Sequence, residues 1–279
     1  MIDFTNAESW LLRGFKSLLL EHDAASTASC LAGELVVKAC GELAILRRVS
    51  RRKSSDALLA SVDLMQIVAR VSRSIHDDVK SSIILRHIAA LEGRPDRSSF
   101  IHPLAEFSWE IRYCEEIAGN SSRDVAYWQQ VAKRSLRAVL TAEDAHLRIA
   151  VYNFTHSVFF GSDFGMCPFS INTEVDLSAL LRALARLLED SEEWDLLYEV
   201  IAVQGIFGLL TKNETRRVLS GAIPAFQDAD GWLWSEGRPR ELTEASKALI
   251  TYSFFHTTLA AILLRRICEI GPKSRSMRL

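Results

Sequence analysis

Residues 122–160 of the chain read SRDVAYWQQVAKRSLRAVLTAEDAHLRIAVYNFTHSVFF. This stretch contains neither Pro nor Gly, and its apolar residues recur every three or four positions. Such spacing places apolar side chains on one face of a helix, and nothing in the stretch breaks the hydrogen-bond ladder. Residues 141–144 combine a hydroxyl with two acids, a composition that favours a helix start. We therefore predict two consecutive helices, one beginning near Ser122 and one extending to Phe160.

The same helical pattern covers most of the remaining sequence. The 279 residues include only 6 Pro and 13 Gly, and no run alternates with a period of two for long enough to predict a sheet. We predict further helices over residues 7–21, 26–48, 54–74, 77–93, 104–119, 176–189, 193–210, 214–226 and 241–270, with Asn6 as the first N-cap. The fold class expected is all-α, with about eleven helices in one domain over residues 1–271. Residues 272–279 are expected to form a basic C-terminal tail.

Weak internal repetition indicates how the helices are arranged. Residues 41–44, 105–108 and 198–201 each place a Glu inside an apolar helix, with another helix in between. Recurring helix pairs predict an array of α/α hairpins, in which each pair buries its apolar face against its neighbours. Such an array can be an open solenoid or a closed toroid around a central pocket. The alternative is an irregular helical bundle.

The segment AFQDADGWLW, residues 225–234, resembles the Gln-x-x-Asp-Gly-x-Trp turn of α/α toroids of the terpene-cyclase and prenyltransferase type. In this interpretation Gly231 supplies unusual backbone angles, Gln227 binds freed backbone groups and a Trp stacks over them. The resemblance implies a fold and no activity. Two motifs of terpenoid chemistry are incomplete, since DDVKS at residues 77–81 lacks the later carboxylate of a DDxxD site. DADG at residues 228–231 supplies at most half of a DxDD acid.

A second resemblance covers more of the chain. GELAILRR (41–48), HSVFFGSDFG (156–165), WDLLYEV (194–200) and FHTTL (255–259) are similar to segments of a poorly characterised group of bacterial helical proteins. That group is found among natural-product biosynthesis genes. The resemblance implies a biosynthetic setting and brings no reaction with it.

Composition and charge exclude several classes of protein. Lys and Arg total 33 against 35 Asp and Glu, so the chain has no cationic excess for nucleic acid or an anionic membrane. The five Cys are widely spaced, and the N-terminus lacks the basic region of a signal peptide, so we expect a cytoplasmic protein with reduced thiols. Motifs for nucleotide binding, for a serine nucleophile and for HExxH zinc binding are absent, which argues against a nucleotide cofactor.

Two histidines are the strongest candidates for chemistry. His156 and His256 each follow an aromatic helical stretch, so each is expected to face the interior, where an imidazole requires a partner. The loop 161–173 contains Asp163, which could join them as an orienting carboxylate. His156, Asp163 and His256 are therefore predicted as an acid–base group, or as ligands of a divalent metal if one binds. The alternatives are core histidines bonded to backbone or Thr hydroxyls, and an Asp163 that caps a helix end.

Several Glu and aromatic residues could serve either in a functional site or only in the structure of the helices. Glu42, Glu106 and Glu199 could converge as a carboxylate cluster, although such residues commonly pair with an Arg such as Arg47, Arg112 or Arg182. Seven aromatic side chains could line a substrate cavity, although aromatic residues at helical spacing more often pack a core. These seven are Trp109, Phe154, Phe159, Phe160, Trp232, Phe254 and Phe255.

Two functions remain open from the sequence. In the first, the protein is a bacterial natural-product tailoring enzyme that acts on a small or peptide-derived substrate in an aromatic cavity. In the second, it is a non-catalytic helical partner that supports another biosynthetic enzyme or binds a peptide. The expected partners are accordingly a biosynthetic protein or a second copy of the chain.

Overall fold

The computed structural model describes residues 1–24, 30–50, 63–71, 88, 108–117, 123–225, 227, 231–233 and 247–270. Its helices are α1 (Phe4–Ala24), α2 (Cys30–Ser50), α4 (Leu64–Val71), α6 (Ser108–Ile117), α7 (Val125–Thr141), α8 (Asp144–Gly161), α9 (Leu177–Asp190), α10 (Trp194–Ile206), α11 (Lys212–Leu219) and α12 (Lys247–Ile270). The described residues form no strand beyond an isolated bridge between Gln227 and Leu233. The all-α prediction is therefore confirmed, although the described part contains fewer than eleven helices.

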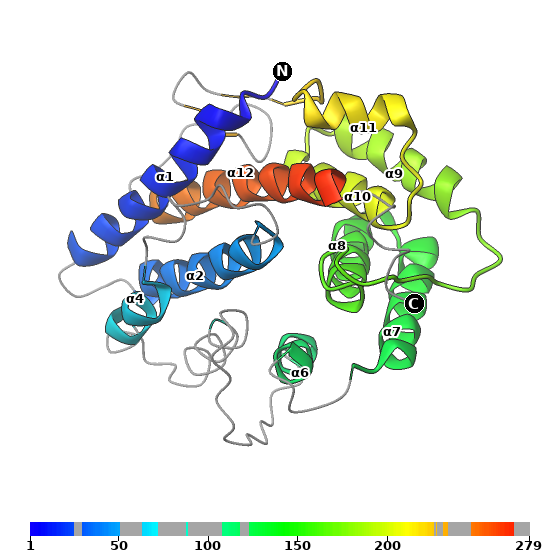
Figure 1. Ribbon diagram of the computed structural model, residues 1–279, viewed down its shortest axis with the longest axis horizontal. Helices are drawn as coiled ribbons and strands as arrows, with labels where there is room; N and C mark the ends of the chain where they lie inside the picture. The colour runs from blue at the N-terminus through cyan, green and yellow to red at the C-terminus, as the bar shows by residue number, and fades with distance from the viewer. Residues whose placement is uncertain are drawn as a thin grey trace.

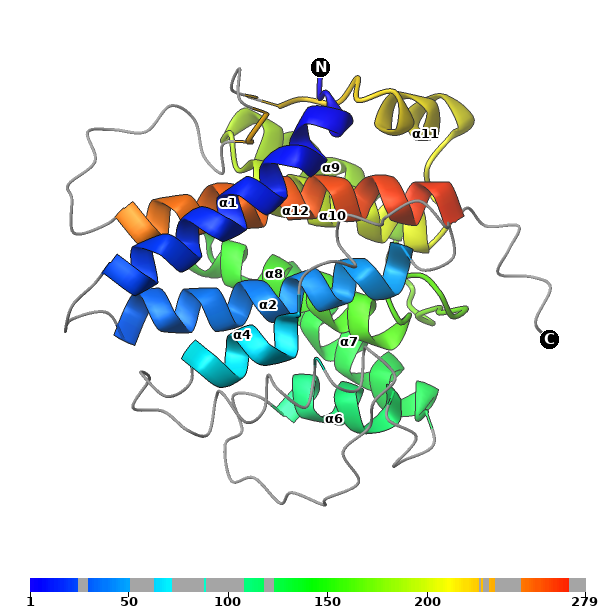
Figure 2. The same cartoon turned by 60° about the vertical axis from the view of Figure 1, so that its left-hand side comes forward.

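Helix α12 occupies the middle of the molecule. It packs against α1 and α2 on one side and against α10 and α11 on the other (Figures 1 and 2). α10 also contacts α8 and α9, so α10 and α12 together form the centre of the core. Ten of the thirteen residues of α10 are buried, as expected for a helix that is apolar all round. The consecutive helices α7 and α8 pack on each other, as do α9 and α10, which agrees with a hairpin arrangement.

Asp side chains set the starts of several helices, among them α1, α4 and α9. The carboxylate of Asp3 accepts hydrogen bonds from the backbone N–H groups of Thr5 and Asn6, so α1 begins at Phe4, three residues before the predicted start at Ala7. Asp63 accepts from the N–H of Gln66 and opens α4 inside the range 54–74, for which one helix was expected. Asp176 accepts from the N–H of Ala179 and begins α9 at the expected position.

The turn before α12 fixes the N-terminal segment of the chain. The side-chain amide of Gln227 accepts from the N–H of Asp3 at 2.7 Å and donates to the carbonyls of Asp3 and Gly231. Gly231 has a φ of +99°, and a Cβ there would lie 2.7 Å from the backbone oxygen of Asn6. The Trp232 ring packs on Phe254, with centroids 4.2 Å apart. The expected local interactions of Gln227 and Gly231 are therefore present, and they join the turn to the beginning of α1.

Several sequence predictions fall outside the described residues. These include the helix at 77–93, of which only residue 88 is described, and the basic tail at 272–279. Among the thiols that are described, Cys40, Cys167 and Cys268 are free. No helix in the described ranges combines the length and apolar character needed to cross a bilayer.

Candidate functional site

Both predicted histidines lie at one group of ionisable side chains between α2, α8, α10 and α12. We call Glu42, His156, Glu199 and His256 the acid–base cluster. The ring of His256 lies between the two carboxylates, with Nδ1 3.1 Å from Oε1 of Glu42 and Nε2 3.8 Å from Oε1 of Glu199. Nε2 of His156 lies 3.5 Å from the same Glu199 oxygen. Four helices far apart in sequence therefore supply one continuous chain of proton-binding groups.

Glu199 is the shared member of the acid–base cluster. It projects from the mostly apolar α10, and its side chain is only 7% exposed. Besides the two histidines on Oε1, its Oε2 accepts a hydrogen bond of 2.5 Å from the hydroxyl of Thr155. A buried carboxylate needs such partners, because burial without them disfavours the charged form. Glu199 is therefore held in place by groups from both α8 and α12.

The cluster shifts the proton affinities of its members. Burial alone would lower the pKa of His256, but the carboxylates of Glu42 and Glu199 outweigh burial and raise it to about 9. Burial would raise the pKa of Glu42, but the charge and hydrogen bond of His256 bring it below its usual value. The pKa of Glu199 is likewise lowered, because both histidines outweigh its burial. His256 is therefore an imidazolium at neutral pH, held between two carboxylates.

Glu42 has one oxygen that is fully engaged and one that is not. Oε1 accepts a hydrogen bond of 2.5 Å from the Tyr252 hydroxyl and lies against His256. Oε2 is buried and has no hydrogen-bond partner in the described part of the chain. An acceptor of this kind costs free energy unless a donor reaches it. Of the acceptors in the cluster, Oε2 of Glu42 is the one at which a hydrogen bond from a bound molecule would contribute most to binding free energy.

The acid–base cluster is close to the surface. The side chains of His156 and His256 are 21% and 19% exposed. Beside them, Tyr152 is exposed and its ring lies against that of His156, tilted by 35° with centroids 3.9 Å apart. Lys38 lies 5.1 Å from the centre of the Tyr252 ring. A molecule that reaches the cluster from outside would therefore meet the α8 face bearing Tyr152 and His156.

Asp163 lies in a different group from the two histidines. Its Oδ1 accepts hydrogen bonds from Nε of Arg48 and from the Tyr113 hydroxyl, and its Oδ2 accepts from Nη2 of Arg48. The structure therefore assigns Asp163 to the turn that follows α8, and it does not assemble the predicted set of His156, Asp163 and His256. Within the described ranges, no group of three His, Cys, Asp or Glu residues is placed to hold a metal ion.

The seven aromatic candidates lie in or against the core. Five of them are buried, namely Phe154, Phe159, Phe160, Phe254 and Phe255, and Trp109 and Trp232 are half-buried. Phe159 and Phe160 lie about 6 Å from the ring of His156, between centroids, and Phe160 also packs on Tyr113 and Trp128. The contacts of Phe159 and Phe160 restrict the orientation of the His156 ring.

Some members of the site were harder to find from the sequence. The sequence suggested Glu42 and Glu199 only as members of a possible carboxylate cluster or as partners of arginines. In the structure both carboxylates contact histidines. Glu106, the third member of that group, lies outside the described residues. Tyr252 was missed, and so was Asp195, whose pKa is raised by burial despite the nearby charge of His256. An acid inside an otherwise apolar helix was the available signal for Glu199.

Comparison with known proteins identifies a family and no activity. Residues 108–265, more than half of the chain, match the family described as "Domain of unknown function (DUF6895)", and the chain belongs to that family. No curated protein and no solved structure matches the chain significantly. The matched range contains His156, Glu199 and His256, whereas Glu42 lies before it.

Proposed function

We propose that this member of the DUF6895 family is an enzyme that performs general acid–base catalysis at the acid–base cluster. The observation that carries the proposal is the position of His256 between Glu42 and Glu199, with His156 on the same Glu199 oxygen. Groups with shifted pKa values, held together near the surface, are characteristic of catalytic sites. A structural role would be served equally well by apolar side chains of similar volume.

The four residues have distinct roles in this proposal. His256, with a pKa of about 9, is the proton donor, and Glu42 orients its ring through Nδ1. His156 is the group that accepts a proton from substrate on the exposed side. Glu199 contacts both rings, so a proton gained at His156 returns to His256 along the cluster and restores the starting state. In each cycle the substrate therefore loses one proton to His156 and gains one from His256.

The proposed substrate is small or peptide-derived. It would approach along the exposed face of α8, where Ile149, Tyr152 and Asn153 lead to His156. A hydroxyl or amide donor of the substrate would satisfy the buried Oε2 of Glu42. The resemblance to helical proteins of natural-product gene clusters makes a tailoring reaction the proposed biological setting.

The experiment is a comparison of variants on a complex substrate mixture. Purified protein is incubated with small-molecule and peptide extracts of its host, and mass spectrometry records which components are consumed. We expect His256→Gln and His156→Gln to reduce consumption by about 10²–10⁴-fold. His146→Gln is the matched control, because His146 lies exposed on the same helix α8, ten residues before His156. Equal consumption by all variants would refute the assignment.

The non-catalytic alternative has one specific observation in its favour. Ile149 on α8 and Leu140 on α7 are 67% and 47% exposed, and both lie close to the turn between these helices. Exposed apolar side chains of this size can mark a protein contact. Native mass spectrometry of protein purified from its host would show a stoichiometric protein complex, and Ile149→Ser would disrupt that complex while leaving the fold intact.

A further inference from the structure

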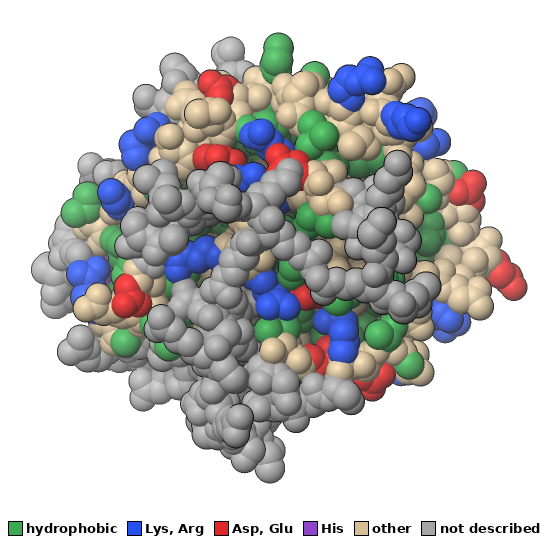
Figure 3. Space-filling model, in the orientation of Figure 1, with side chains coloured by type: hydrophobic (Ala, Val, Ile, Leu, Met, Phe, Trp, Pro, Cys, Tyr) green, Lys and Arg blue, Asp and Glu red, His purple; other side chains and the backbone are tan. Residues whose placement is uncertain are grey.

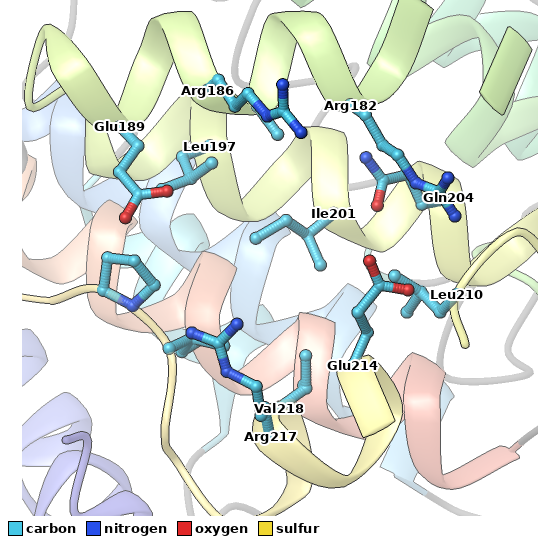
Figure 4. A pocket seen from close by; sticks show the side chains of 13 residues that line it. Arg182, Arg186, Glu189, Leu197, Ile201, Gln204, Leu210, Glu214, Arg217 and Val218 are labelled. Atoms are coloured by element: carbon cyan, nitrogen blue, oxygen red, sulfur yellow. The ribbon is translucent and has the colours of Figure 1, made fainter. Parts of the chain in front are cut away.

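A pocket lies between α9, α10 and α11, away from the acid–base cluster. Its volume is about 240 Å³, and Figure 4 shows its lining. The floor is apolar and includes Leu197 and Ile201 of α10 together with Val218 of α11. Leu197, Ile201 and Gln204 follow a helical spacing, on a face of α10 that turns away from Glu199. The same helix therefore serves two separate sites.

Arginine side chains dominate the rim of this pocket. Arg182 and Arg186 come from α9 and Arg217 from α11, and in Figure 4 Arg186 and Arg217 lie on opposite sides of Ile201. In the described part of the chain, neither Arg182 nor Arg186 makes a hydrogen bond or ion pair. Two carboxylates, Glu189 and Glu214, share the rim with the three arginines. Oε2 of Glu214 accepts from the N–H of Thr211 in a capping box, and this bond lowers the pKa of Glu214 together with the nearby charges of Arg182 and Arg217. The rim therefore carries one formal positive charge in excess around an apolar floor, and Figure 3 shows Lys and Arg side chains gathered over α11.

The strongest sign of a ligand is Gln204. Its side chain lines the pocket and is buried, with 5% exposure, and its Nε2 has no hydrogen-bond partner among the described residues. In Figure 4 its amide points into the space next to Ile201, below Arg182. A buried donor without an acceptor is destabilising, and an apolar residue of the same size would avoid that cost. A ligand oxygen in the pocket would supply the missing acceptor.

We propose that this pocket binds a small carboxylic acid with an apolar body. The carboxylate would pair with Arg186 and Arg217 and accept a hydrogen bond from Gln204, while the apolar body covers Leu197, Ile201 and Val218. The volume lies below the range of about 300–1,000 Å³ typical of drug-sized ligands, so the acid is small. The proposal does not depend on the acid–base cluster being catalytic.

The test uses 4-phenylbutyrate as the probe, with 4-phenylbutan-1-ol and 4-phenylbutylamine as matched compounds of the same apolar body. Isothermal titration calorimetry on the full chain should give saturable binding of the acid with a Kd tighter than about 1 mM. The alcohol and the amine should bind at least tenfold more weakly. Absence of saturable binding, or equal binding of the three compounds, overturns the proposal.

Variants separate this site from unspecific binding. Arg186→Gln and Arg217→Gln should each weaken binding of the acid about tenfold, whereas Arg216→Gln should not, because Arg216 is exposed on α11 outside the pocket. Gln204→Leu should raise the Tm of the free protein and reduce the Tm increase caused by the acid. If Gln204→Leu lowers the Tm of the free protein, or if the Arg variants bind as the unchanged chain does, the proposal fails.

Discussion

Arg48 and Asp163, 115 positions apart in sequence, form a two-pronged ion pair, with Nε to Oδ1 at 3.0 Å and Nη2 to Oδ2 at 2.7 Å. The pair joins the end of α2 to the turn after α8. Asp163 and Phe164 have φ values of +50° and +53°, in a region that side chains rarely adopt. Such a conformation costs of order 1–3 kcal/mol per residue and persists only where the surroundings hold it. The ion pair and the Tyr113 hydroxyl provide that restraint.

Asp163→Asn should therefore lower the free energy of unfolding by about 2–3 kcal/mol, because an amide cannot pair with both nitrogens of Arg48. Urea denaturation measures the change. Asp190→Asn, at the exposed end of α9, is the control and should alter stability by less than about 0.5 kcal/mol. If Asp163→Asn keeps full stability but loses turnover, Asp163 takes part in catalysis and is not needed for stability.

Stability should depend on pH through His256. Its pKa is raised from 6.5 to about 9 in the folded protein, so the stabilisation is complete below about pH 6.5 and is lost as pH rises through 9. The loss should amount to at most about 3 kcal/mol, measured by urea denaturation at pH 6 and above pH 9. His256→Gln should flatten this dependence and His146→Gln should preserve it. A flat profile for the unchanged chain would contradict the ion-paired state of His256.

At acid pH the stability of the protein depends on the carboxylates of Glu42 and Glu199. The pKa values of Glu42 and Glu199 are lowered, so their stabilisation is present above about pH 4.5 and disappears as pH falls below that value. Glu42→Gln should lower the pKa of His256 more than Glu199→Gln does, because Glu42 has the larger effect on it. Histidine titration by NMR measures both pKa values. A greater effect of Glu199→Gln would mean that Glu199, and not Glu42, contributes most to the raised pKa of His256.

The N-terminal segment gives a prediction with a built-in control. Gly221 and Gly208 have similar φ values, +73° and +70°. A Cβ at Gly221 would overlap the backbone oxygen of Ile2, whereas nothing lies within 4 Å of a Cβ at Gly208. Gly208→Ala should cost about 1 kcal/mol from backbone strain, and Gly221→Ala should cost clearly more, because Ile2 must move. Equal losses in thermal unfolding would show that the Ile2 contact adds nothing.

The helices were largely predictable because they depend on local periodicity. α9 begins and ends one residue from its predicted limits, and α8 begins inside the predicted range 141–144 and ends one residue after Phe160. Errors arose where a glycine terminates a helix earlier than the apolar pattern suggests. The helix predicted over 193–210 ends at Ile206, before the positive φ of Gly208, and the one predicted over 214–226 ends at Leu219, before Gly221.

The candidate site was only partly predictable because its partners come from distant parts of the chain. The apolar helices around His156 and His256 predicted that both would face the interior, and the structure leaves their side chains 21% and 19% exposed. Their shared contact with Glu199 depends on how α8, α10 and α12 pack, which residue spacing does not report. Likewise, nothing near Asp163 in the sequence reveals that Arg48 binds it.

The central position of α12 also bears on synthesis of the protein. This helix follows every other described helix in the sequence, yet it contacts α1, α2, α10 and α11. During synthesis α1 and α2 leave the ribosome long before α12 does, so the faces that pack against α12 stay uncovered until it is made. Newly made chains that stop before residue 247 lack α12, so the faces of α1 and α2 that pack against it would be exposed to chaperones and proteases.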